Sequence, residues 1–101
     1  MKYNKLVRDK IPEIMKAKGE NPIVHIASDE EYSKKLQDKL REEVAEFIGS
    51  SEPEELADII EVVYAICDLK KIDKKQLEDI RIKKAEERGG FSKRIILDEK
   101  N

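Results

Sequence analysis

Acidic side chains gather in two short stretches of this 101-residue sequence. Within each stretch the acids recur three or four residues apart, a spacing that puts side chains on one face of a helix. Carboxylates brought together repel one another unless a cation lies among them. Oxygen-only ligands select a hard cation, so Mg²⁺ is favoured and Mn²⁺ also fits. The acids are Glu42, Glu43 and Glu46 in the first stretch and Glu55, Asp58 and Glu61 in the second.

The acids of the second stretch lie among apolar residues. The segment LADIIEVVYAI, residues 56–66, predicts a buried helix, yet it carries Asp58 and Glu61. A buried charge is costly unless it is paired or bound to a metal. Two structural explanations stay open beside the metal site. Glu61 could form an ion pair with a Lys or Arg, and Glu54 and Glu55 could favour a helix N-terminus.

A long helix is expected to carry the first acidic stretch. Ser28 and Glu31 form the capping-box pattern of a helix start, and Gly49 is expected to end the helix. Glu43 lies along the apolar stripe of this helix, three residues after Leu40. The stripe recurs at helical spacing and consists of Tyr32, Leu36, Leu40, Val44, Phe47 and Ile48.

A second helix, running to about Leu69, is expected to carry the other acids. Ser51 with Glu54 repeats the capping-box pattern at its start. Eight residues, 47–54, separate Glu46 from Glu55, and so short a connection makes the two helices antiparallel neighbours. The two acidic stretches should then face each other.

Apolar residues surround nearly the whole circumference of this second helix. A helix that is apolar on all sides must be covered on all sides. One partner helix and a short third helix hardly suffice for that in a chain of this length, so we predict a homodimer or homotetramer. The apolar residues are Ile59, Ile60, Val62, Val63, Tyr64, Ile66 and Cys67.

Shorter elements are expected around this hairpin. A short helix should span residues 11–18, and a third long helix should run from the capping box of Asp73 and Gln76 to Gly89. Residues 22–27 form a strand or an extended arm, and residues 94–97 form a possible last strand that could pair with residues 23–26. The predicted fold is mostly α: a single domain over residues 1–101, built on an antiparallel helical hairpin or bundle with one or two short β segments and completed by oligomerisation.

Composition excludes several classes of protein. The formal net charge is −2, which gives no bulk attraction to nucleic acid or to an anionic membrane surface. No apolar run reaches the length of a membrane span, and the N-terminus is charged too early for a signal peptide. Cys67 has no cysteine partner, which suits a reducing cytoplasm, where we expect the protein to be. His25 is the only histidine and lies outside the long helices, which excludes di-iron and zinc sites.

The two acidic stretches match a known pattern. The segment EEVAE (42–46) followed by ELAD (55–58) resembles the EExxE…ExxD signature of the MazG-like, all-α nucleoside triphosphate pyrophosphohydrolases. The segments YNKLVRDKIPEI (3–14) and KKAEERGGF (83–91) resemble the flanks of a small single-domain branch, which is similar to phosphoribosyl-ATP pyrophosphohydrolase. The resemblance runs from Tyr3 to Leu97, although the spacer between the two acidic motifs is shorter than is usual in the superfamily.

The resemblance implies an activity and a role for each acid. The activity is hydrolysis of a nucleoside triphosphate between the α and β phosphates, giving a monophosphate and pyrophosphate. The catalytic acids are Glu42, Glu43 and Glu46, with Glu42 as a ligand or a water-orienting base. The Mg²⁺ ligands are Glu43, Glu46, Glu55 and Asp58. We add Glu61, which extends the same face and would hold a second metal ion or a water.

An acidic site also needs bases to hold a triphosphate. Two basic groups are available, one in the N-terminal arm and one around the RGGF segment at 88–91, where Gly89 and Gly90 let backbone N–H groups approach a phosphate. The alternative is that these bases merely solvate a surface. A base could act on its own chain or across a subunit interface. The candidates are Lys5, Arg8, Lys10, Lys83, Arg88 and Arg94.

The function expected from this resemblance is Mg²⁺-dependent hydrolysis of noncanonical or surplus nucleotides. Two alternatives stay open at this point. One is phosphoribosyl-ATP hydrolysis in histidine biosynthesis. The other is a non-enzymatic helical oligomer whose acids serve solubility and register.

Overall fold

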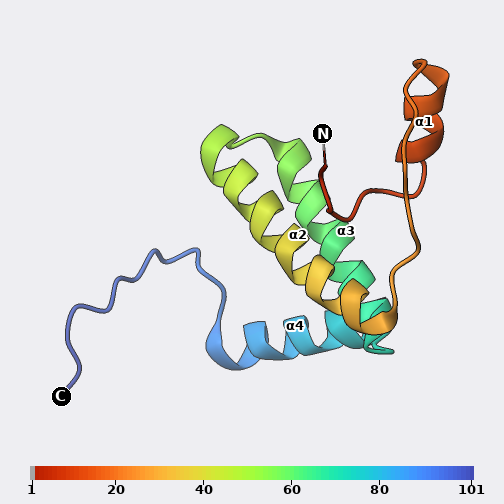
Figure 1. The fold of residues 1–101 in the computed structure, drawn as a ribbon. Coiled ribbons are helices and arrows are strands. Elements are labelled where there is room, and N and C mark those ends of the chain that lie inside the picture. Colours follow the sequence, from red (N-terminus) through yellow and green to blue (C-terminus); the bar gives the residue numbers. More distant parts are fainter. Residues whose placement is uncertain (1) are drawn as a thin grey trace.

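A computed structural model describes residues 2–101 of the protein and shows four helices in that range. Helices α2 and α3 lie side by side as an antiparallel hairpin (Figure 1). Helix α4 packs against α3 at the end opposite the hairpin loop, and α1 stands apart on the N-terminal arm (Figure 1). The prediction of a mostly α fold is confirmed. The helices are α1 (Ile11–Ala17), α2 (Asp29–Ser50), α3 (Pro53–Leu69) and α4 (Lys74–Arg88).

Helix α2 begins where its capping residue predicts and ends two residues later than expected. The Ser28 hydroxyl accepts a hydrogen bond from the backbone N–H of Glu31 at 3.2 Å, which confirms the N-cap. The Glu31 carboxylate lies 2.9 Å from Nε2 of His25. The prediction that Gly49 ends the helix was wrong. Ser51, in the left-handed region at φ 58°, is the C-cap, because its N–H still bonds to the carbonyl of Phe47 at 2.7 Å.

The capping box predicted at the start of α3 was also wrong. The N-cap is Glu52, and its side chain makes no capping hydrogen bond. The helix start relies instead on Pro53, whose fixed φ suits the first helical position. At α4 the prediction is confirmed, since Asp73 and Gln76 form both hydrogen bonds of the capping box. Gly89, at φ 83°, ends α4 as predicted.

The two predicted β segments do not form. Within residues 2–101 no residue is assigned to a strand. Residues 23–26 lie on the connection between α1 and α2, whereas residues 94–97 lie beyond α4 on the other side of the hairpin (Figure 1). Ile23 and Ile95 are 95% and 79% exposed. An isolated strand pair without an apolar face to pack on has little stability in water.

The core of the hairpin is small. Its buried apolar residues in the described range are Leu36 of α2 and Val62 and Cys67 of α3. Leu56 and Ile60 on α3 remain 46% and 51% exposed, so the described part of one chain leaves part of this helix uncovered. The oligomer that would cover it stays a prediction. No helix in residues 2–101 is long and apolar enough to cross a membrane.

Candidate metal centre

The hairpin brings three of the predicted acids together. Glu43 of α2 faces Glu55 and Asp58 of α3, and each offers one carboxylate oxygen that lies within 4.8 Å of the other two. Glu55 and Asp58 share one face of α3 because they are three residues apart. The predicted meeting of the two acidic stretches is therefore seen for these three residues, which we call the acid triad.

Glu43 is the most enclosed member of the acid triad. Its residue surface is only 6% exposed. One oxygen, Oε1, lies 3.4 Å from Nζ of Lys39. The other, Oε2, is buried and has no hydrogen-bond partner. A buried acceptor without a partner loses its hydration and gains nothing in return, so this oxygen needs either a proton or a cation.

The surroundings of Glu43 work against its negative charge. Burial is the largest cause that raises the pKa of this carboxyl above its ordinary value, and the negative charges of Glu46 and Asp58 raise it further. The ammonium of Lys39 lowers the pKa and offsets part of this effect. A divalent cation among these acids would favour the ionised carboxylate in the same way, and with twice the charge.

Basic side chains of the N-terminal arm reach the same place. Nη2 of Arg8 lies 2.7 Å from Oδ1 of Asp58, fifty residues away in the sequence. Nζ of Lys5 lies 3.6 Å from Oε1 of Glu42, and Nζ of Lys39 lies 3.4 Å from Oε2 of the same residue. The bases and acids border one open hollow of about 280 Å³. Its lining consists of Lys5, Val7, Arg8, Ile11, Lys39, Glu43 and Asp58.

Three predicted acids lie outside the acid triad. Glu42 is one third exposed and faces the bases rather than the triad. Glu46 is exposed, although it is near enough to raise the pKa of Glu43. Glu61 is also exposed, one turn beyond Asp58. The roles predicted for these three residues stay predictions.

Sequence reasoning missed Lys39. Its side chain is 19% exposed and pairs with both Glu42 and Glu43. The available signal was its spacing, since it stands four residues before Glu43 on the same helix face. The site therefore contains a positive charge that the pattern of acidic residues did not predict.

Three of the six predicted phosphate-binding bases lie away from the acid triad in this chain. Lys83 and Arg88 lie on α4, which leads away from the hairpin, and Arg94 lies on the C-terminal segment beyond it (Figure 1). Lys10 is the exposed N-cap of α1 and does not line the hollow. Lys5 and Arg8 are the two predicted bases that do. The bases on α4 and the C-terminal segment do not line the hollow, and their predicted role stays a prediction.

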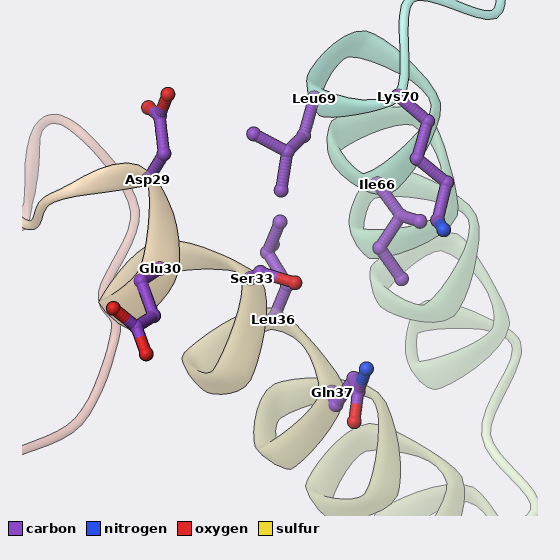
Figure 2. Close-up of a pocket in the computed structure, with 8 residues that line it drawn as sticks. All are labelled: Asp29, Glu30, Ser33, Leu36, Gln37, Ile66, Leu69 and Lys70. Carbon is purple, nitrogen blue, oxygen red and sulfur yellow. The ribbon is translucent and has the colours of Figure 1, made fainter.

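A second hollow, of about 350 Å³, opens at the other end of the hairpin, between the start of α2 and the end of α3 (Figure 2). Leu36, Ile66 and Leu69 line it, and the carboxylates of Asp29 and Glu30 point out from its rim (Figure 2). None of the predicted site residues lines this hollow. The candidate functional site is therefore the one around the acid triad.

Over part of its length the chain is similar to a curated protein. Over 41 residues it is 54% identical to an uncharacterized protein of Mycolicibacterium smegmatis. The match covers 41% of this chain and 42% of that protein's length. No protein-family model matches the chain. No solved structure matches it either.

Proposed function

We propose that the protein is a Mg²⁺-dependent nucleoside triphosphate pyrophosphohydrolase, which releases a nucleoside monophosphate and pyrophosphate. The observation that carries this proposal is the buried, unpartnered Oε2 of Glu43 within the acid triad, two members of which, Glu43 and Asp58, line a hollow together with basic side chains. The acidic side chains would bind a cation, and the basic side chains would bind an anion. A metal-bound polyphosphate combines these two charges in one ligand. The MazG-like resemblance of the two acidic motifs points to the same chemistry.

The side chains of the acid triad suit a hard divalent cation. Glu43, Glu55 and Asp58 would hold it through carboxylate oxygens alone, the ligands that Mg²⁺ prefers. When bound, Mg²⁺ would polarise the phosphate oxygens and lower the pKa of a water molecule. The fit rests on Glu43, because its unpartnered oxygen is the group for which a cation removes a cost.

The other side chains of the hollow would bind and orient the substrate. Lys5 and Arg8 would contact the phosphates, since both are partly exposed and lie at the open side of the site. A guanidinium donates two parallel hydrogen bonds to phosphate oxygens, which positions the group as well as neutralising it. Glu42, held between Lys5 and Lys39, would orient the attacking water. The reaction would then proceed mainly by positioning and charge stabilisation.

The size of the hollow limits what it can hold. Its 280 Å³ is slightly below the range of about 300–1,000 Å³ that is usual for small-molecule sites. We infer that it takes the phosphates and that the nucleoside lies outside it. A partner subunit covering Leu56 and Ile60 on α3 would enlarge the site, and it would also enclose the apolar surface that one chain leaves open.

A pyrophosphate-release assay tests the proposal. Canonical and modified nucleoside triphosphates, together with phosphoribosyl-ATP, are each incubated with the protein, with Mg²⁺ or with EDTA. We expect Mg²⁺-dependent release of pyrophosphate with the matching monophosphate. Asp58→Asn, nearly isosteric, should lose at least about 100-fold in rate while keeping the fold. Glu54→Gln removes the same charge from an exposed position on α3 outside the acid triad, and it should keep the activity.

The products discriminate between the outcomes. Orthophosphate and a nucleoside diphosphate would place cleavage at the terminal phosphate and contradict the proposed reaction. Full activity in Asp58→Asn would remove the acid triad from the mechanism. No turnover of any substrate, with no effect of Mg²⁺ on the melting temperature, would favour the non-enzymatic oligomer.

A further inference from the structure

Arg8 already occupies the acid triad with its positive charge. Its Nη2 donates to Oδ1 of Asp58 at 2.7 Å, so one of the triad carboxylates is engaged by a cation of the protein itself. The neighbouring oxygen of Glu43 is unpartnered at the same time. A divalent cation that enters the triad must therefore share the Asp58 carboxylate with this guanidinium or displace the guanidinium from it. Two positive charges at contact distance from one carboxylate repel each other.

The N-terminal arm that carries Arg8 is held by weak polar contacts. Lys35 donates to the backbone carbonyl of Asn4 at 2.7 Å, and Lys5 lies 3.6 Å from Glu42. The side chains of Arg8 and Asp58 are 57% and 37% exposed. Exposed ion pairs of this kind add little stability, so the arm can release Asp58 at small cost. Leu6 and Ile11 are only half-buried and leave the arm a limited apolar anchor.

We propose that Arg8 is an exchangeable ligand of the site: it neutralises Asp58 in the metal-free protein and transfers to a substrate phosphate once a divalent cation takes its place. This inference rests on the metal site of the proposed function. It adds an order of events, in which the cation binds first and frees the arginine that then holds the polyphosphate. Arg8 is thus a binding residue whose availability depends on the metal.

The charges around Asp58 fit such an exchange. Glu43 and Glu55 are the other acids close to it, and Lys39 pairs with Glu43 rather than with Asp58. No second base in residues 2–101 forms an ion pair with Asp58, so loss of Arg8 leaves that carboxylate free for a metal ion. A purely structural ion pair would instead stay closed when the metal binds.

Two titrations and one spectroscopic signal test this proposal. Isothermal titration calorimetry measures Mg²⁺ binding to the metal-free wild type, to Arg8→Gln and to Lys16→Gln, and then pyrophosphate binding at saturating Mg²⁺. Lys16→Gln is the matched control, since Lys16 is an exposed base on α1 that makes no ion pair in the described range. In parallel, NMR follows the Arg8 Nε–Hε cross peak, which is identified by its loss in Arg8→Gln.

Arg8→Gln should change the two affinities in opposite directions. We expect Mg²⁺ to bind roughly two- to fivefold more tightly, because an exposed competing pair is removed. Pyrophosphate should bind about tenfold more weakly, because a charge-assisted contact is lost. Lys16→Gln should match the wild type in both titrations. The Arg8 cross peak should shift on addition of Mg²⁺ and again on addition of pyrophosphate.

The outcomes separate this inference from the proposed function. If the wild type binds Mg²⁺ but Arg8→Gln binds it equally well, or the Arg8 signal does not respond to Mg²⁺, the exchange is refuted and the metal site stands. Equal effects of Lys16→Gln and Arg8→Gln would also refute it, since the cause would then be net charge. If the wild type binds no divalent cation, both the exchange and the proposed metal site are refuted.

Discussion

Glu43→Gln should stabilise the protein without metal and remove its response to metal. The substitution keeps the shape of the side chain and removes one negative charge from a residue that is 6% exposed. A glutamine amide can still accept a hydrogen bond from Lys39. A small side-chain adjustment would let its NH₂ group donate to Asp58 or Glu55, whose ligand oxygens lie within 4.8 Å of one from Glu43. The unpartnered oxygen of the wild type would thereby be replaced by a donor that can reach an acceptor.

The expected magnitude follows from the contacts of Glu43. An unsatisfied buried acceptor costs about 1–3 kcal/mol, and the substitution removes that cost. The lost charge attraction to Lys39 at 3.4 Å offsets up to about 1 kcal/mol. The free energy of unfolding should therefore rise by about 1 kcal/mol, which corresponds to about 4–8 °C in melting temperature for a domain of this size.

Saturating Mg²⁺ should reverse the order of stability of the wild type and Glu43→Gln. A ligand that binds only the folded state at a concentration 100 times its Kd adds about 2.7 kcal/mol to the free energy of unfolding. The wild type gains this stabilisation and Glu43→Gln does not, so the wild type should become the more stable protein in saturating Mg²⁺. Thermal unfolding followed by circular dichroism, in EDTA and in rising MgCl₂, measures both effects.

A control and a refuting result complete this test. Glu54→Gln removes an equal charge outside the acid triad and should leave the Mg²⁺ response unchanged. A lower melting temperature of Glu43→Gln in EDTA would show that the buried carboxylate is satisfied in the metal-free protein. Equal stabilisation of both proteins by Mg²⁺ would show that Glu43 is not a ligand.

Two further predictions concern pH and helix capping. Because the pKa of Glu43 is raised in the folded state, the native protein binds more protons than the unfolded chain between the ordinary glutamate pKa of about 4.5 and the folded pKa. The contribution of this carboxyl to stability should thus fall as the pH rises through that window, and urea midpoints in EDTA should decrease there for the wild type more than for Glu43→Gln. Asp73→Ala removes the hydrogen bond from the Gln76 N–H to the Asp73 carboxylate at 2.7 Å, and should lower the free energy of unfolding by about 1 kcal/mol in a urea titration. An unchanged midpoint in Asp73→Ala would show that the start of α4 contributes nothing to global stability.

Local sequence signals determined the helices of this protein. The caps at Ser28, Asp73 and Gly89 act within one turn, so they can be identified from neighbouring residues alone. The same is true of the acid spacing that puts Glu55 and Asp58 on one face of α3. The predicted cap at Ser51 was wrong because another local feature starts α3. Pro53 begins this helix without a side-chain cap.

Which acids meet was decided only by the tertiary structure. The sequence offered six candidate acids on two helices, and helical spacing could not choose among them. The choice depends on how each helix is rotated about its axis and where the two cross. A three-residue step moves a side chain about 4.5 Å along the axis. The position of the crossing therefore decides that Glu55 and Asp58 both reach Glu43, whereas Glu46 and Glu61 stay outside the acid triad. Burial of apolar side chains between helices sets such a rotation, and the buried apolar residues in the described range are Leu36, Val62 and Cys67.

The long-range contacts of the site were equally beyond the sequence. The pairing of Arg8 with Asp58 joins residues fifty positions apart, and no periodic pattern links them. The burial of one Glu43 oxygen is a property of the folded chain, so composition and spacing cannot reveal it. Local interactions within the chain therefore determined which elements form, whereas packing between distant segments determined which charged groups share a site.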